Sequence, residues 1–420
     1  MVHEFAGDTL VTGRGWNNIA VRWLARIFLI MLAAVLLLPP LESLFNFFPT
    51  ISLDEHRHTA AAPKVSLLLS STAAKFADLF NDWFDERIGF RDVAIRWAHD
   101  LDARLFGVSR KVYIGSDGWL FERKMTDSRL DIERITEEKY QAVEESFLSL
   151  AHRLRQRGIS LVIIDYPDKS EFYPEYLPSL SPNLPVEGRL ARLRRALDND
   201  PDVIRIDVGQ LLRPLKASGE PIYYKTDIHI GTEGAIPVVK EIVRRVAQLE
   251  GRNISWDETF RWRRVPWAEG SEARFLALSR PVSETVLAAS NFYQVGQPVA
   301  DGHWVMNPDP KLIYPRAGRY PLFDWEYISN PDQCENRLPV TALFGNSFSD
   351  LYWSLGLQRY FCKLRRARTP TFRLGPYLEH LPPATKYVIL QYLASYLPKE
   401  SPLFGNSILP VTSSDFEAPR

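Results

Sequence analysis

The sequence predicts an α/β fold in which helices cover both faces of a parallel sheet. From residue 136 onward, short apolar runs alternate with amphipathic helical patterns, as is typical of parallel sheets. The run at 159–164 is apolar except for one serine, as expected for a strand that is covered on both faces. A chain of 420 residues is also long enough to bury a large core.

An apolar segment with the character of a membrane span precedes the predicted sheet. Residues 23–48 are mostly apolar, although their unbroken core at 27–38 is short enough for a signal peptide as well. Arg26 can snorkel to the interface, and Pro39-Pro40-Leu41-Glu42 stands where a cleavage site would follow. We therefore expect an uncleaved signal-anchor in the inner membrane. The positive-inside rule then keeps residues 1–22 in the cytoplasm and places the remaining chain in the periplasm.

The exported part is expected to consist of a linker, residues 49–66, and one domain, residues 67–420. Two amphipathic helices open this domain, and their aromatic stripes are more typical of a core than of a binding surface. A β-hairpin with an Asp-Gly turn is predicted at 112–121. At about 250–338, an insertion rich in tryptophan and proline interrupts the regular pattern.

Helices and strands alternate in the rest of the domain. Thr136 is the predicted N-cap of a helix that ends at Gly158. The other elements are predicted from apolar periodicity. Strands are expected at 159–164, 203–208, 340–344 and 387–391, and helices at about 190–197, 235–249 and 348–357.

Composition argues against several classes of function. The 51 basic and 51 acidic residues balance, so we expect no nucleic-acid partner. The sequence has neither a zinc-type Cys/His spacing nor a phosphate-binding glycine loop, so no metal or cofactor is expected. The 11 tryptophans suit sugar stacking and ordinary core packing equally well. Cys334 and Cys362 could form a disulfide, worth roughly 3–4 kcal/mol in an oxidising compartment, or both could remain thiols.

A candidate nucleophile lies in the stretch Leu338–Asp350, LPVTALFGNSFSD. A short apolar strand ends at Gly345, and a helix is predicted to begin directly after Ser347. This order lifts the hydroxyl of Ser347 above the edge of the sheet and directs the free N–H groups of the helix start to the same place. Such N–H groups stabilise an oxyanion. The backbone N–H of Ser347 is the one donor that the sequence identifies.

The segment Asp227-Ile228-His229 offers the base that a serine nucleophile needs. In an extended segment residues i and i+2 project to the same side, so Asp227 can accept the Nδ1–H of His229 and fix its tautomer. A predicted helix start follows, where catalytic groups of open α/β sheets collect. Ser347, His229 and Asp227 are therefore predicted to form a catalytic triad. A structural histidine is the alternative for an isolated Asp-x-His.

Other histidines are weaker candidates for the base. Asp301-Gly302-His303 repeats the spacing, but it lies in the irregular insertion without a helix start behind it. The others lie in the predicted cytoplasmic segment, in the linker, on helices or beside a glutamate: His3, His56, His58, His99, His152 and His380.

A basic cluster follows the candidate nucleophile and comprises Lys363, Arg365, Arg366 and Arg368. It could line a groove for an acidic polymer. We favour the alternative, that it is the solvent-exposed face of a helix.

Several of these stretches together resemble the alginate O-acetyltransferase family of the AlgJ/AlgX type. They occur in the family's order from about residue 75 to 395: Phe84-Asp85-Glu86-Arg87-Ile88-Gly89-Phe90-Arg91, Gly115-Ser116-Asp117-Gly118-Trp119-Leu120-Phe121, Pro167-Asp168-Lys169, Asp227-Ile228-His229 with Gly234-Ala235, and Gly345-Asn346-Ser347-Phe348-Ser349. The resemblance implies an SGNH-hydrolase-like domain and acetyl transfer to a sugar hydroxyl through an acetyl-serine. Ser347 would be the nucleophile, His229 the base and then the acid, and Asp227 the group that orients His229.

The resemblance also implies partners. An exported polysaccharide, alginate-like or another exopolysaccharide, would be the acceptor. A separate multi-span membrane acyltransferase would relay the acetyl group across the inner membrane. Two alternatives remain open: an SGNH-type carbohydrate esterase that uses the same triad with water as the acceptor, and a non-catalytic glycan-binding or assembly protein that uses the tryptophan-rich insertion.

Overall fold

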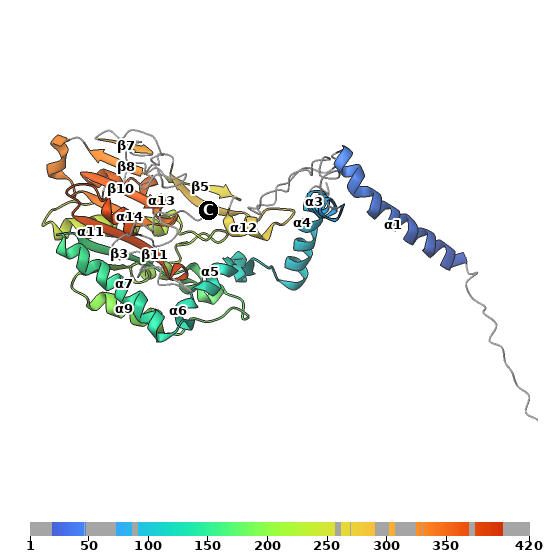
Figure 1. Ribbon diagram of the computed structural model, residues 1–420, viewed down its shortest axis with the longest axis horizontal. Coiled ribbons are helices and arrows are strands. Elements are labelled where there is room, and N and C mark those ends of the chain that lie inside the picture. Colours follow the sequence, from blue (N-terminus) through green and yellow to red (C-terminus); the bar gives the residue numbers. More distant parts are fainter. Residues whose placement is uncertain are drawn as a thin grey trace, which may run out of the picture. The chain divides into compact units, whose positions relative to one another are not determined.

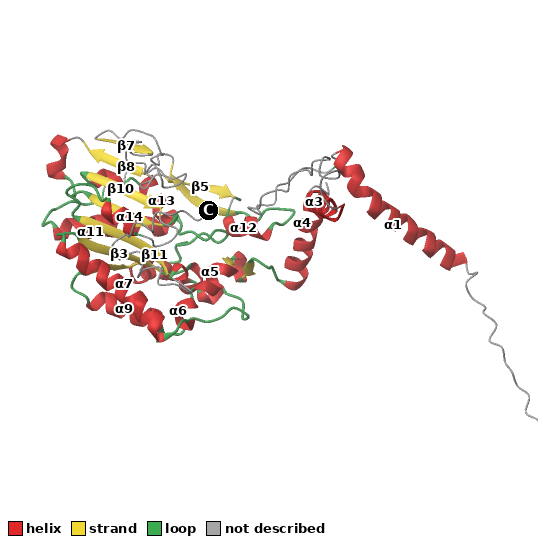
Figure 2. Ribbon diagram, viewed as in Figure 1, coloured by secondary structure: helices red, strands yellow, loops and turns green. Residues whose placement is uncertain are grey.

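The structure is a computed structural model whose chain divides into two compact units, Met1–Leu101 and Asp102–Arg420. It describes residues 19–45, 47, 73–85, 91–256, 262–268, 270–289, 302–306, 325–329, 331–368 and 374–397. The boundary between the units differs from the predicted domain start at residue 67, because the two amphipathic helices belong to the first unit. Figures 1 and 2 show the elements of each unit.

The first unit contains the helices α1 (Ile19–Phe45), α3 (Ala73–Asp85) and α4 (Arg91–Leu101). Among the residues that the structure describes, no helix combines the length and the apolar character needed to cross a membrane. The aromatic stripes of α3 and α4 do not form a core as expected, since Trp97 remains 63% exposed and Phe80 40% exposed. Amphipathic spacing predicted these helices, but it did not reveal what their apolar faces contact.

The second unit is built on one seven-stranded sheet with the order β4-β3-β11-β9-β10-β8-β7. Its strands are β3 (Ser160–Tyr166), β4 (Val203–Asp207), β7 (Gly302–Met306), β8 (Trp325–Ser329), β9 (Thr341–Gly345), β10 (Lys363–Arg368) and β11 (Tyr387–Leu393). The first five strands in the order pair in parallel, as predicted, whereas β8 and β7 extend the sheet antiparallel. The insertion therefore supplies one edge of the sheet.

Helices cover both faces of the sheet. On one face, α7 (Glu137–Gln156) and α9 (Arg189–Asn199) pack through apolar side chains against alternate residues of the central strands. On the other face lie α10 (Val208–Ala217), α11 (Thr232–Leu249) and α13 (Phe348–Ser354). The two-residue period of a strand separates these cores: Ile163 faces the first and its neighbours Val162 and Ile164 the second. The predicted α/β sandwich is confirmed.

The basic cluster lies on a strand and not on a helix, contrary to our expectation. Strand β10 pairs with β9 on one side and with β8 on the other. Arg365 and Arg366 are 7% and 1% exposed, so neither belongs to a solvated face. The expectation was wrong because charge is a poor indicator of exposure where a buried guanidinium finds hydrogen-bond acceptors.

Two hairpins and a disulfide complete the description of the second unit. The hairpin β1 (Val112–Ile114) and β2 (Leu120–Glu122) forms as predicted. A second hairpin, β5 (Trp262–Trp267) and β6 (Glu284–Ala289), comes from the insertion. The short helix α12 (Ser271–Leu276) lies between its two strands in the chain. Cys334 and Cys362 form a disulfide, which decides between the two states that the sequence left open.

Candidate active site

The turn that carries Ser347 is fixed from both sides of the chain. Strand β9 ends at Gly345, and Ser347 directly precedes α13. The N–H of Asn346 donates to Gln391 Oε1 of β11 at 3.0 Å, and its Oδ1 accepts the N–H of Phe348 at 3.0 Å. Gly345 is needed here because a Cβ would lie 2.7 Å from Gln391 Oε1. The backbone N–H of Ser347 has no hydrogen bond to any described residue.

A buried arginine lies beneath this turn. From β10, Arg366 Nη2 donates to the carbonyl of Asn346 at 3.1 Å, and its Nε donates to Ser349 Oγ at 3.1 Å. The same side chain forms an ion pair with Asp350. Because these acceptors lie on both sides of Ser347, Arg366 fixes the backbone that presents the hydroxyl. Arg366 belongs to the basic cluster that was predicted to form the solvent-exposed face of a helix.

The loop that carries His229 is organised by the carboxylate of Asp227. Asp227 Oδ1 accepts from His229 Nδ1 at 2.5 Å and from the His229 backbone N–H at 2.9 Å. Its Oδ2 accepts the N–H of Ser271 at 2.7 Å. Burial alone would raise the pKa of Asp227, but the hydrogen bonds from His229 and Ser271 outweigh it and hold the pKa of this carboxyl well below its usual range. Asp227 is therefore ionised at neutral pH.

The two loops meet at the carboxyl ends of the parallel strands. His229 Nε2 lies 2.7 Å from Ser347 Oγ, within hydrogen-bond distance, so Asp227, His229 and Ser347 form one continuous chain. The ring of Phe348 lies beside the imidazole, with 5.2 Å between centroids. The side chain of His229 is 32% exposed, which leaves the chain accessible from solvent.

The rival histidines lie elsewhere. His303 is on β7, the outermost strand of the sheet, and its predicted partner Asp301 lies outside the described residues. His3, His56 and His58 also lie outside them, whereas His99 and His152 are on α4 and α7 and His380 follows α14 (Gly375–Glu379). In the described part of the chain, no group of three or more His, Cys, Asp or Glu side chains is arranged to hold a metal ion.

Residues to which the sequence assigned no role hold the Asp227 loop in place. Lys169 Nζ donates to the carbonyls of Lys225 and Asp227, each at 3.0 Å, and forms an ion pair with Glu272 of α12. Glu284 of β6 accepts from the backbone N–H groups of Lys225 at 2.9 Å and of Thr226 at 2.8 Å. The insertion therefore supplies two supports for this loop. The only sequence signal was the Pro-Asp-Lys stretch at the end of a predicted strand.

Comparisons with known proteins show what this chain is similar to. A family model described as "SGNH hydrolase-like domain, acetyltransferase AlgX" matches residues 112–298. Residues 112–298, less than half of the chain, are therefore similar to the AlgX-type SGNH hydrolase-like domain. The resemblance found in the sequence is confirmed. The matched range includes Asp227 and His229, and Ser347 follows it in the chain.

Curated relatives and solved structures show the extent of the similarity. "Probable alginate O-acetylase AlgJ" of Pseudomonas fluorescens is 26% identical over 165 residues, 39% of this chain and 41% of the relative. The protein of the same name from Pseudomonas putida is 28% identical over 159 residues, 37% of this chain and 40% of the relative. The chain thus matches less than half the length of these relatives. The O-acetyltransferase domain of Pseudomonas putida AlgJ superimposes with a TM-score of 0.42 at 17% identity, covering 69% of this chain and 93% of that one. Bacillus cereus PatB1 gives 0.46 at 13% identity, with coverages of 69% and 97%.

We predict that Lys169→Met destabilises the fold by about 3–5 kcal/mol, because it leaves the buried carboxylate of Glu272 without its cation. The double variant Lys169→Met/Glu272→Gln should recover part of this loss, since the amide oxygen can still accept the N–H of Glu122. Urea denaturation measures both. Lys139→Met, at an exposed position of α7, is the matched control and should change stability little. A Lys169→Met protein as stable as the wild type would contradict this account.

Proposed function

We propose that the protein is an O-acetyltransferase that moves an acetyl group, through an acetyl ester on Ser347, to a hydroxyl of an exported polysaccharide. The observation that carries the proposal is the continuous hydrogen-bonded chain from Asp227 through His229 to Ser347. It is supported by the match of residues 112–298 to the AlgX-type family model and by similarity to relatives named as alginate O-acetylases. In this proposal the three residues form a catalytic triad.

The first half of the reaction forms the acetyl-enzyme. Ser347 Oγ attacks the carbonyl carbon of an acetyl ester, and His229 Nε2 takes the hydroxyl proton as the C–O bond forms. Asp227 stabilises the resulting imidazolium through Nδ1. In this proposal the backbone N–H of Ser347, which has no hydrogen bond to any described residue, donates to the oxyanion of the tetrahedral intermediate. Collapse breaks the bond to the donor oxygen, which leaves with the proton from His229.

The second half reverses these steps with a new alcohol. A sugar hydroxyl takes the place of the donor, and His229 removes its proton as the oxygen attacks the acetyl carbon. The bond to Ser347 Oγ then breaks, and His229 returns the proton to that oxygen. Water in place of the sugar would make the same site an esterase, so the products decide between the two reactions.

We further propose that residues 23–48, most of which lie in α1, anchor the chain in the inner membrane with the second unit in the periplasm. The disulfide between Cys334 and Cys362 supports an oxidising compartment. The basic residues Arg14 and Arg22 precede the apolar segment and favour a cytoplasmic N-terminus. In such a location a multi-span membrane acyltransferase would supply the acetyl group from the cytoplasmic side.

The acetyl-enzyme is the direct test of the proposed reaction. Full-length protein incubated with p-nitrophenyl acetate should gain one acetyl group on Ser347, located by peptide mass spectrometry. Ser347→Ala should abolish the adduct, and His229→Ala should slow its formation by about 10³-fold or more. His303→Ala, the rival Asp-x-His histidine, is the matched control and should acylate normally. A wild-type protein that never acylates would exclude the proposed reaction, and release of free acetate without transfer to any oligosaccharide would favour an esterase.

Export can be tested through the disulfide. If the second unit is periplasmic, a maleimide added to denatured cell extracts should fail to label Cys334 and Cys362 of the wild-type chain. Ile30→Arg/Leu32→Arg places two charges in the apolar core of the predicted anchor and should leave the chain in the reducing cytoplasm, where both thiols label. Full labelling of the wild-type chain would refute the proposed location.

A further inference from the structure

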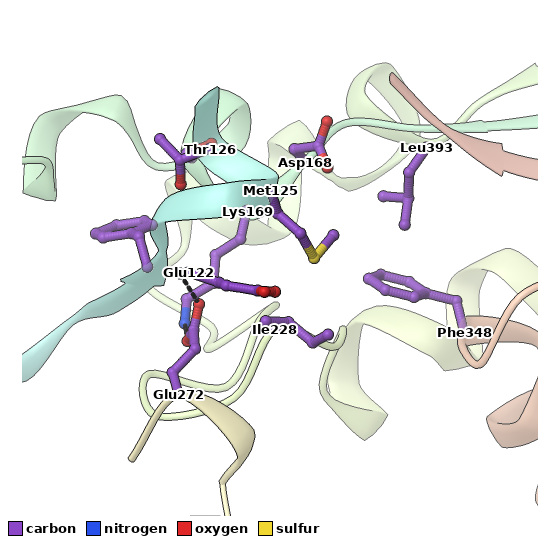
Figure 3. A pocket seen from close by; sticks show the side chains of 11 residues that line it. Glu122, Met125, Thr126, Asp168, Lys169, Ile228, Glu272, Phe348 and Leu393 are labelled. Atoms are coloured by element: carbon purple, nitrogen blue, oxygen red, sulfur yellow. Dashed lines mark hydrogen bonds and ion pairs between the residues drawn. The ribbon is translucent and has the colours of Figure 1, made fainter. Parts of the chain in front are cut away.

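A small pocket, shown in Figure 3, is lined in part by Phe348, whose ring centroid lies 5.2 Å from that of His229. Two of its lining residues are neighbours of the triad in sequence: Ile228 stands between Asp227 and His229, and Phe348 follows Ser347. With Met125 they form an apolar wall. The pocket has room for about one water-sized group, so it fits one substituent of a ligand and not a whole ring.

Most polar groups that line the pocket already have partners within the protein. Lys169 and Glu272 form an ion pair with each other. The carboxylate of Asp168 accepts the N–H of Ser395 at 3.0 Å and its hydroxyl at 2.6 Å. Each of these side chains therefore already has a hydrogen-bond or ion-pair partner within the protein.

Glu122 is the exception among the charged residues of the lining. Its backbone N–H donates to Glu272, but its carboxylate has no hydrogen bond or ion pair with any residue that the structure describes. Figure 3 shows this carboxylate directed into the pocket between Met125 and Ile228. Burial raises the pKa of Glu122, against the opposing charge of the exposed Lys124. A half-buried carboxylate without a partner is a hydrogen-bond acceptor available to a ligand.

The Glu122 carboxylate, as a hydrogen-bond acceptor, distinguishes between the two substrates of the proposed reaction, the acetyl donor and the sugar. An acetyl group carries no hydrogen-bond donor, so it gains nothing from Glu122. A sugar offers hydroxyl donors, and an amino sugar offers an ammonium group that would also neutralise the charge. A uronate carboxylate in the same pocket would face Glu122 as a like charge. The apolar wall suits the C–H groups of a sugar ring at the pocket mouth.

We propose that this pocket binds a hydroxyl or ammonium group of the acceptor through Glu122, and that the acceptor is a neutral or amino sugar rather than a uronate. The inference rests on the proposed function for the identity of the ligand as an acceptor. Alginate is a polyuronate, so this chain would differ in acceptor from the relatives that are named for alginate. Glu122 is then a specificity-determining residue on β2, in a part of the chain that contributes nothing to the triad.

Oligosaccharide binding to a full-length variant that cannot be acetylated tests this inference independently of the proposed reaction. Isothermal titration calorimetry on Ser347→Ala would compare three probes of equal length: cello-oligosaccharide, chitosan oligosaccharide and oligomannuronate. We expect either or both of the first two to bind more tightly than the uronate. Glu122→Gln added to Ser347→Ala keeps the shape but removes the charge. It should weaken the preferred probe by about 10- to 100-fold while the uronate is unchanged or binds better.

Glu145→Gln, an exposed glutamate on α7, is the matched control and should leave the order of the three probes unchanged. Binding of the cello-oligosaccharide but not of the chitosan oligosaccharide would identify a hydroxyl as the recognised group. Binding of the chitosan oligosaccharide alone would identify an amino sugar. Equal or tighter binding of oligomannuronate, or a preference that survives Glu122→Gln, would overturn the inference. Because these measurements need no acetylation, failure to acylate Ser347 would count against the proposed function alone.

Discussion

The hydrogen bonds to the carboxylate of Asp227 are the interaction on which the site depends. Asp227 is 6% exposed, and an ionised carboxylate at such a position is unfavourable unless donors surround it. The imidazole of His229, its backbone N–H and the N–H of Ser271 provide those donors. The same contacts fix the ring so that Nε2 faces Ser347 Oγ. The same hydrogen bonds therefore stabilise the buried charge of Asp227 and orient the imidazole of His229.

Segments far apart in the chain converge to hold this arrangement. Lys169 follows the end of β3 and reaches the carbonyls of the Asp227 loop, while Glu272 and Glu284 come from the insertion. On the other side of the site, Arg366 of β10 holds the turn of Ser347. The sequence predicted the insertion as an irregular interruption. Its contacts instead make it part of the scaffold that positions the base.

Local pattern predicted most of the fold, and contacts across the fold account for what it missed. The four predicted strands are all present. Strands β3, β9 and β11 are buried along nearly their whole length, as expected for strands covered on both faces, whereas β4 at the edge of the sheet is only partly buried. Strand β10 was missed because a run of basic residues is typical of a solvated surface. Only the folded structure brings Arg366 to its hydrogen-bond acceptors, Asn346 and Ser349, which allow it to be buried. Asp227, His229 and Ser347 could be selected from spacing and predicted strand ends. The role of Lys169 could not be predicted from local pattern, because its ion-pair partner Glu272 lies 103 positions away in the sequence.

The central claim, that Asp227 orients His229 toward Ser347, can be tested most directly by proton NMR of full-length protein with ¹⁵N-labelled histidine. A hydrogen bond from His229 Nδ1–H to a buried carboxylate predicts a strongly downfield proton resonance coupled to an imidazole nitrogen. The account predicts that this resonance persists in Ser347→Ala and disappears in Asp227→Ala. A downfield resonance that is absent from the wild type, or that survives loss of the Asp227 carboxylate, would contradict it.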